Sequence, residues 1–256
     1  MMKKILCLIL ALAMVLSAAA FAENTQGDSP ETILSGMSLR DKVAQMMIAS
    51  FRVWQEVPPE GEEMPEEEPP RENITRLNDE IRDMVSRNHF GGILLFGQNF
   101  VDAEQTLRLI ADYQASNRAG GGLPQIVFTD QEGGNVNRIP YGTQGLGNMA
   151  LGATGDAENA RATAAIFGEE LGLLGIQADF APVVDVNNNA LNPIIGIRSF
   201  SDDPQTVAAF GSAYIQGLHD AGIISTAKHF PGHGDTDTDS HTGAPVINRT
   251  YEELKK

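Results

Sequence analysis

The chain has 256 residues, of which 42% are hydrophobic and 6% aromatic, and its formal net charge is −16. This composition fits a soluble globular domain, and the negative charge argues against nucleic acid or an anionic lipid surface as a partner. The only cysteine is Cys7, inside a segment expected to be removed, so the mature chain can form neither disulfides nor a cysteine metal site.

Residues 1–22 have the three parts of a secretory signal peptide. Lys3 and Lys4 precede an apolar run over residues 5–15, and small residues lead to Ala22. The run is too short to span a membrane. We therefore expect cleavage after Ala22, a secreted or cell-envelope location, and no membrane contact of the mature protein. Loss of the two lysines moves the formal net charge from −16 to −18.

The rest of the chain is predicted to form one domain over residues 38–256, preceded by a polar leader and the start of the first helix over residues 23–37. Residues 56–72 read EVPPEGEEMPEEEPPRE. Such a segment buries too little apolar surface to offset its ordering entropy, so it is predicted to be a disordered surface insertion. A role in binding calcium or a partner is the alternative, and a solvated loop is the preferred interpretation.

Helix-length segments alternate with short apolar runs through this domain. Ser38-x-x-Asp41 predicts a helix start, with Leu39, Val43 and Met46 following at helical spacing. The apolar runs predicted to be strands are residues 46–51, 91–96, 125–129, 178–184 and 223–227. Further helices are expected around Ile74–Met84, around Leu107–Gln114, over 157–174 and from Asp203-Pro204 onward. This pattern indicates parallel strands that are buried on both faces.

Polar residues follow these runs. Gln98-Asn99 comes after the second run, Asp130 to Glu132 after the third, Asp185 after the fourth and Lys228-His229 after the fifth. Chemistry at the carboxyl ends of successive parallel strands is typical of a (β/α)8 TIM-type barrel, whereas a doubly wound sheet gathers ligands at one switch point. A barrel has eight strands, so we expect an α/β barrel truncated after about the fifth strand.

Two polar segments offer candidate chemistry, and the first is DQEGGNVNR, from Asp130 to Arg138. Its two glycines allow a tight backbone turn. A carboxylate and a guanidinium facing one pocket would suit a polyhydroxylated ligand. The alternative is a structural Asp–Arg pair that caps the turn, and these residues alone do not decide between the two.

The second segment is KHFPGHGDTDTDSH, residues 228–241, with three histidines, a lysine and three aspartates. A zinc site is one interpretation, with ligands among His229, His233, Asp235, Asp239 and His241. Against it, no HExxH-like helical spacing occurs and Lys228 would repel a cation. We favour a dyad in which the Asp239 carboxylate orients the His241 imidazole for general acid catalysis, and we predict neither a metal nor another cofactor.

Five motifs together carry a resemblance to a known family. They are GGILLFGQN (residues 91–99), DQEGGNVNR (130–138), FAPVVDVNNN (180–189), IGIRSF (195–200) and KHFPGHGDTDTDSH (228–241). In this order and spacing the chain resembles the N-terminal barrel domain of glycoside hydrolase family 3, from about Ser38 to the last residue. More narrowly it resembles the β-N-acetylhexosaminidase branch, the NagZ-like enzymes.

The resemblance implies site residues. Asp130, Arg138, Arg198, Lys228 and His229 would bind a terminal N-acetylglucosamine. His241 would be the general acid/base and Asp239 its partner. The implied substrate is a glycan or muropeptide containing N-acetylglucosamine, and the implied activity of the whole enzyme is that of a retaining exo-β-N-acetylglucosaminidase that acts on peptidoglycan fragments.

The family mechanism also requires a nucleophilic aspartate after the seventh strand, in an SDD-like motif. Ser201-Asp202-Asp203 belongs to the fourth connection between strand and helix and is no substitute. We therefore expect the nucleophile beyond Lys256, and we expect this chain to be inactive by itself. Two alternatives stay open, namely a β-N-acetylglucosaminide phosphorylase and a non-catalytic carbohydrate-binding remnant. The sequence makes no prediction of oligomeric state.

Overall fold

A computed structural model describes residues 29–56, 69–239, 241–247 and 249–254. The predicted signal peptide and most of the predicted insertion therefore lie outside the described residues. The chain divides into two compact units, Met1–Val43 and Ala44–Lys256. No helix in the described ranges is long and apolar enough to span a membrane.

The first unit contains α2 (Pro30–Gly36) and nearly all of α3 (Leu39–Ala44). The Ser38 hydroxyl accepts a hydrogen bond from the backbone N–H of Asp41 at 3.1 Å, which confirms the predicted helix start. The expected continuation of this helix to Met46 is wrong, because α3 ends at Ala44. The side chain of Met46 is exposed.

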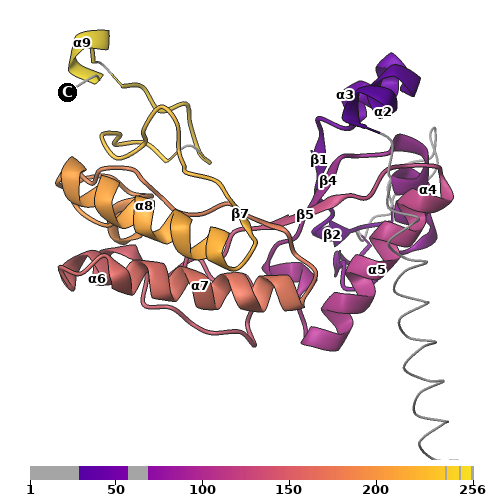
Figure 1. The fold of residues 1–256 in the computed structure, drawn as a ribbon, viewed down its shortest axis with the longest axis horizontal. Coiled ribbons are helices and arrows are strands. Elements are labelled where there is room, and N and C mark those ends of the chain that lie inside the picture. The colour runs from indigo at the N-terminus through magenta and orange to yellow at the C-terminus, as the bar shows by residue number, and fades with distance from the viewer. Residues whose placement is uncertain (1–28, 57–68, 240, 248, 255–256) are drawn as a thin grey trace, which may run out of the picture. The chain divides into compact units, whose positions relative to one another are not determined.

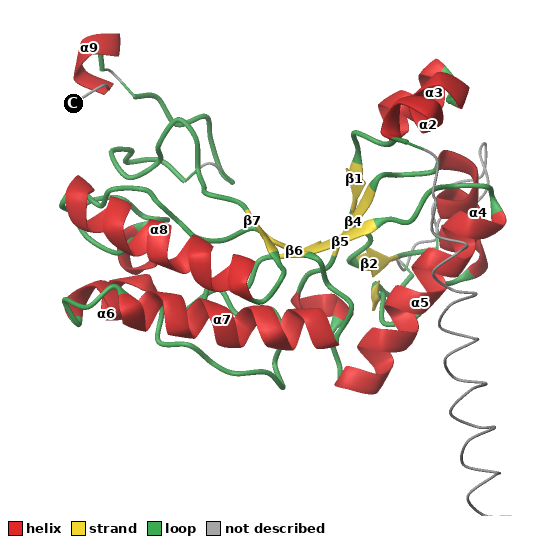
Figure 2. Cartoon of the chain, viewed as in Figure 1, coloured by secondary structure: helices red, strands yellow, loops and turns green. Residues whose placement is uncertain are grey.

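The second unit is built on one parallel sheet. Its strands, in sheet order, are β1 (Ile48–Ala49), β4 (Gly92–Leu94), β5 (Ile126–Thr129), β6 (Ala178–Asp179) and β7 (Ile224–Ser225). The strands of this sheet lie side by side in the order in which they follow one another along the chain, as in a barrel, and Figure 2 shows them as one curved row. The predicted α/β class and the five parallel strands are confirmed, and within the described residues the sheet stays open.

Every strand is shorter than its predicted run. The run predicted over residues 178–184 contributes only Ala178–Asp179 to β6. Beyond it the backbone keeps isolated hydrogen bonds to the segment after β7, from the Thr226 N–H to the Ala181 carbonyl and from the Val184 N–H to the Lys228 carbonyl. The apolar runs therefore predicted the location of each strand but not the residue at which it ends. The ends are set by where the carboxyl-terminal residues turn away to build the loops above the sheet.

Helices follow the strands along the chain. They are α4 (Asp79–Asn88), α5 (Ala103–Ala119), α6 (Asn148–Ala153), α7 (Glu158–Leu173), α8 (Pro204–Asp220) and α9 (Tyr251–Leu254). Figure 1 shows α4 beside α5 and α7 running along α8. The helix expected around Ile74 begins only at Asp79, because the Asn78 side chain caps it by accepting the Ile81 N–H at 2.9 Å. The short α6 was not predicted.

A small hairpin borders the acidic segment. Strand β2 (Val53–Trp54) pairs antiparallel with β3 (Glu72–Asn73). Glu72 was expected to belong to a structureless insertion, and this is wrong because its backbone pairs with Trp54. Residues 57–68 between the two strands are outside the described residues.

The core under the sheet fixes the base of the polar loops. Tyr113, Phe167, Phe200 and Tyr214 are among its largest fully buried side chains, and burying such a side chain contributes roughly 1.5–3 kcal/mol. The ring of Phe200 packs against that of Tyr214 with centroids 6.3 Å apart. This packing holds α8 against the segment that leads into it, so the loops above rest on a rigid layer.

Candidate functional site

Lys228, the first residue of the segment 228–241, contacts two carboxylates of the segment 130–138. Lys228 Nζ lies 2.7 Å from Asp130 Oδ1 and 2.6 Å from Glu132 Oε1. The side chains are 13%, 14% and 2% exposed, respectively. Asp130 comes directly after β5 and Lys228 follows β7, so the parallel sheet brings together residues 98 positions apart in sequence.

Glu132 is the centre of this cluster. Its two carboxylate oxygens accept hydrogen bonds from Arg198 Nε at 2.9 Å and Arg198 Nη2 at 2.8 Å. Such a bidentate pair fixes both groups in one plane. Burial by itself would raise the pKa of Glu132, but hydrogen bonds and charge attraction from Arg198 and Lys228 outweigh it and lower the pKa below its ordinary value. Glu132 is therefore held as a carboxylate.

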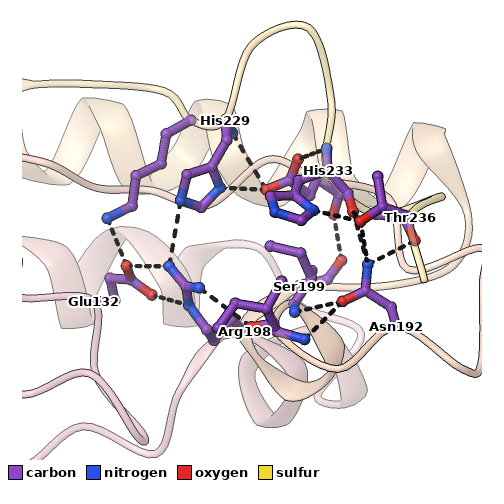
Figure 3. Close-up of polar contacts among 12 residues, drawn as sticks. Glu132, Asn192, Arg198, Ser199, His229, His233 and Thr236 are labelled. Atoms are coloured by element: carbon purple, nitrogen blue, oxygen red, sulfur yellow. Dashed lines mark hydrogen bonds and ion pairs between the residues drawn. The ribbon is translucent and has the colours of Figure 1, made fainter. Parts of the chain in front are cut away.

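Asp185 organises the histidines of the loop. It is buried and comes after β6. Its Oδ2 lies 2.6 Å from His229 Nδ1, and its Oδ1 accepts the backbone N–H of His233 at 2.5 Å. Arg198 Nη2, which can only donate, lies 3.4 Å from His229 Nε2. These partners favour the His229 tautomer that carries its proton on Nδ1, with Nε2 facing Arg198 (Figure 3).

A second layer of contacts supports the loop around His233. The imidazole Nδ1 of His233 lies 2.5 Å from Thr236 Oγ1. Asn192 Nδ2 donates to the carbonyl of His233 at 2.7 Å, and the Ser199 hydroxyl donates to the carbonyl of Asp185 at 2.5 Å. Figure 3 shows Asn192, His233 and Thr236 grouped on one side of Arg198. The loop is thus fixed from below by residues of the segment that precedes α8.

The turn between Asp130 and Arg138 has the expected shape. Gly133 and Gly134 have φ values of +83° and +60°, a region that favours glycine, which confirms the prediction of a tight turn. Arg138 Nη2 lies 3.8 Å from Asp130 Oδ2, farther than Lys228 Nζ. Asp130 is therefore paired more closely with Lys228 than with Arg138.

Asp239 and His241 form a separate pair. His241 Nδ1 lies 2.7 Å from Asp239 Oδ1, which also accepts the backbone N–H of His241 at 2.8 Å. The backbone hydrogen bond and then the imidazole contact lower the pKa of Asp239. The His241 side chain is 76% exposed. No hydrogen bond or ion pair within the described ranges joins this pair to the cluster around Glu132.

Similarity to known proteins places this arrangement in a family. The model of the glycosyl hydrolase family 3 N terminal domain matches residues 38–256. The chain belongs to glycosyl hydrolase family 3. The family 3 domain is 41% identical over 193 residues to Beta-hexosaminidase A of Pseudoalteromonas piscicida, covering 73% of this chain and 32% of that protein. It is 38% identical over 189 residues to Beta-hexosaminidase of Stenotrophomonas maltophilia strain K279a, covering 71% and 54%.

Solved structures agree with these relatives. A family 3 β-N-acetylglucosaminidase from Paenibacillus sp. str. FPU-7 superposes with a TM-score of 0.74 at 38% identity, over 86% of this chain and 38% of that one. NagZ from Neisseria gonorrhoeae, solved in complex with N-trifluoroacetyl-D-glucosamine, gives 0.64 at 34% identity, over 71% and 54%. These matches confirm the resemblance and the barrel-type fold. The family 3 domain spans only 32% and 54% of the two curated relatives.

The predicted site residues of the family 3 domain fall into two groups. Asp130, Arg198, Lys228 and His229 lie in one connected cluster, with Arg138 at its edge. Asp239 and His241 contact each other on the exposed part of the loop. Their catalytic and binding roles stay predictions.

Three residues of the family 3 domain were missed as site residues. Glu132 and Asp185 pair with cationic or imidazole groups, and the backbone N–H of His233 donates a hydrogen bond to Asp185. All three stand in the quoted motifs, and the first two follow strands as Asp130 does. Their position after parallel strands was a usable signal, since carboxyl ends of such strands meet at one edge.

Other polar residues have structural positions. Asn99, which follows β4, is buried and donates to the carbonyls of Phe51 and Ile74 at 2.8 and 2.7 Å. Asp203 caps α8 by accepting the Thr206 N–H at 2.8 Å. In the part of the chain that the structure describes, no group of three or more His, Cys, Asp or Glu side chains is arranged to hold a metal ion.

Proposed function

We propose that this family 3 domain belongs to an exo-β-N-acetylglucosaminidase, which hydrolyses terminal β-linked N-acetylglucosamine. The names of the curated relatives, Beta-hexosaminidase A and Beta-hexosaminidase, support this activity. The observation that carries the proposal is the cluster at the carboxyl ends of the strands, where Lys228 bridges Asp130 and Glu132 within 2.7 Å. Fixed carboxylates and cations with little exposure present the paired acceptors and donors that sugar hydroxyls need.

The proposed roles are sugar binding for the connected cluster and acid/base catalysis for the pair of Asp239 and His241. Asp130 accepts hydrogen bonds from sugar hydroxyls, while Lys228 and Arg138 donate to them. Arg198 and His229 complete the pocket for the terminal sugar. His241, held by Asp239 through Nδ1, keeps Nε2 available to protonate the leaving oxygen and then to activate water, which is the work of a general acid/base.

A retaining mechanism further needs a carboxylate nucleophile on the face opposite the acid. In the described cluster each carboxylate already has a partner: Asp130 holds Lys228, Glu132 holds Arg198, and Asp185 holds His229. We infer that the nucleophile comes from outside the described residues. We further propose that the 256-residue chain alone binds sugar weakly and does not hydrolyse it.

We also propose that the enzyme is exported and acts on peptidoglycan fragments. The signal-peptide pattern of residues 1–22 supports export, and N-acetylglucosamine units of the cell wall are the β-linked substrate that such a location offers. Fractionation of cells that produce the natural protein would test export, and a protein that stays in the cytoplasm with residues 1–22 attached would contradict it.

The activity is tested on the longest natural gene product that contains this chain. It should release p-nitrophenol from the β-N-acetylglucosaminide much faster than from the β-glucoside, and the 256-residue chain should release it from neither. Equal rates on the two substrates would contradict the proposed specificity. Release of p-nitrophenol that depends on added phosphate, with transfer of the sugar to phosphate in place of water, would instead indicate a phosphorylase.

A further inference from the structure

A fully buried carboxyl group lies under the sugar-binding cluster and has no role in the mechanism above. Asp179 is the last residue of β6 and is 0% exposed. Its Oδ1 accepts the backbone N–H of Gln131 at 2.8 Å. Its Oδ2 is buried and has no hydrogen-bond partner in the structure. A buried polar atom without a partner is rare, so this carboxyl requires an explanation.

The residue that Asp179 holds stands between the two carboxylates of the cluster. Gln131 lies between Asp130 and Glu132 in sequence, and its peptide groups are held on both sides. The N–H donates to Asp179, and the carbonyl accepts from the buried Tyr214 hydroxyl at 3.2 Å. Because backbone direction at Gln131 sets where the flanking side chains point, these contacts fix Asp130 and Glu132 toward Lys228.

The side chain of Gln131 extends this control to the turn. Its Oε1 accepts the backbone N–H of Arg138 at 2.9 Å, and its Nε2 donates to Asn137 Oδ1 at 3.1 Å. Gln131 therefore ties the start and the end of the DQEGGNVNR segment together. Asp179 is the side chain that anchors Gln131 to the sheet.

The charges around Asp179 disfavour a further negative charge. Lys228 is already shared by Asp130 and Glu132, at 2.7 and 2.6 Å. Burial raises the pKa of Asp179 well above its ordinary value, and the carboxylates of Asp130 and Glu132 raise it further. The Gln131 N–H and the charge of Lys228 act in the opposite direction, while the hydroxyl of Tyr214 is itself kept neutral by burial.

We propose that Asp179 is a positioning residue that works as an uncharged carboxylic acid. Its carbonyl oxygen holds the Gln131 peptide, and through it Asp130 and Glu132, without competing with them for Lys228. An ionised Asp179 would attract Lys228 away from the sugar-binding carboxylates. The inference rests on the proposed function, because its kinetic test requires hydrolysis of N-acetylglucosaminides.

The test compares Asp179→Asn with Asp179→Leu in the longest natural gene product that contains this chain. Asparagine is neutral and keeps an acceptor for the Gln131 N–H, so KM for the p-nitrophenyl β-N-acetylglucosaminide should stay near the wild-type value. Leucine removes the acceptor and leaves a buried N–H unpaired, and KM should rise by about tenfold or more. As a matched control, Ile81→Ala truncates a buried residue of α4, and it should lower the melting temperature without changing KM.

Infrared spectroscopy supplies a readout that needs no activity. The wild-type minus Asp179→Asn difference spectrum at neutral pH should contain the C=O band of an undissociated carboxylic acid, and a carboxylate band in its place would overturn the proposal. So would an Asp179→Asn variant whose KM rises as much as that of Asp179→Leu, or unchanged KM in both variants. If the wild-type protein hydrolyses no N-acetylglucosaminide, the proposed function fails, and the infrared spectrum still decides the state of Asp179.

Discussion

Two histidines of the loop over residues 228–241 contact carboxylates in different surroundings. Asp185 Oδ2 lies 2.6 Å from His229 Nδ1, and Asp239 Oδ1 lies 2.7 Å from His241 Nδ1. The Asp185 and His229 side chains are 0% and 33% exposed, whereas those of Asp239 and His241 are 30% and 76% exposed. The two pairs therefore have similar distances but different surroundings. Asp185 and His229 belong to a buried network, whereas Asp239 and His241 are held together only by a local turn.

This difference in exposure suggests that the two pairs have different functions, one in binding the sugar and the other in catalysis. The buried network around Glu132 holds the proposed sugar-binding groups in one geometry before substrate arrives, which lowers the entropic cost of binding. The exposed pair leaves the proposed acid/base free to meet a leaving group. Substitutions in the network should mainly affect stability and KM, and substitutions in the exposed pair should mainly affect kcat.

The largest expected effect is on stability. Glu132→Ala removes the bidentate partner of Arg198 and one of the two carboxylates that hold Lys228. Leaving the buried Arg198 guanidinium without its carboxylate costs about 3–5 kcal/mol. Urea unfolding of the natural protein measures this loss. An unfolding free energy within about 1 kcal/mol of wild type would contradict this prediction, because Glu132 would then stabilise the fold no more than an exposed ion pair does.

The next effect is on catalysis. His241→Ala should lower kcat by about 10²-fold or more, the contribution of a general acid/base, with KM and the melting temperature little changed because the side chain is exposed. His219→Ala, at the end of α8 with a contact to Ser225, is the matched control and should leave kcat unaltered. A His241→Ala enzyme with wild-type kcat would exclude this histidine as the acid/base.

A smaller effect is expected when acid pH protonates Glu132 and weakens the buried network. The pKa of Glu132 is lowered in the folded state, so the stability it contributes is fully present above the ordinary glutamate pKa of about 4.3. That contribution is lost as the pH falls through the lowered folded value. Melting temperatures from about pH 6 to about pH 3 should therefore fall more steeply for wild type than for Glu132→Gln. If the melting temperatures of the two proteins fell equally with pH, ionised Glu132 would not contribute to the stability of the fold.

The smallest effect is expected from an exposed ion pair. Glu104 and Arg108 contact each other on α5 with side chains 75% and 77% exposed. Glu104→Ala should change the unfolding free energy by less than about 1 kcal/mol, and added salt should reduce the difference further. A loss as large as that of Glu132→Ala would mean that burial does not explain the contrast between the two glutamates.

The fold class could be predicted because apolar runs and helix-length spacers repeat along the chain. The five predicted strands were all found, yet β6 ends at Asp179 rather than Val184. Strand ends depend on where the regular pairing of two neighbouring backbones stops, which no single run of residues encodes. The β2–β3 hairpin was missed for the same reason, since Trp54 finds its partner Glu72 only across the acidic segment.

The candidate site was predictable in part. Asp239 and His241 are two residues apart, so a turn suffices to bring them together. Glu132 and Arg198 are 66 positions apart. The place of Glu132 after a predicted strand indicated that it would lie near the site, but not that it would be the centre of the cluster. The sequence shows which groups are available, but burial decides which of them must be paired.

The sequence by itself therefore determined which runs become strands, the helix cap at Ser38 and the local His241–Asp239 contact, because each depends on neighbours within a few residues. Only the tertiary structure decided which carboxylate holds which cation, that Asp185 binds His229, and that Asp179 lies fully buried beneath them. The physical reason is that these pairings form at the common edge of parallel strands. Their strength comes from a low-dielectric interior that exists only once the sheet and its helices have packed.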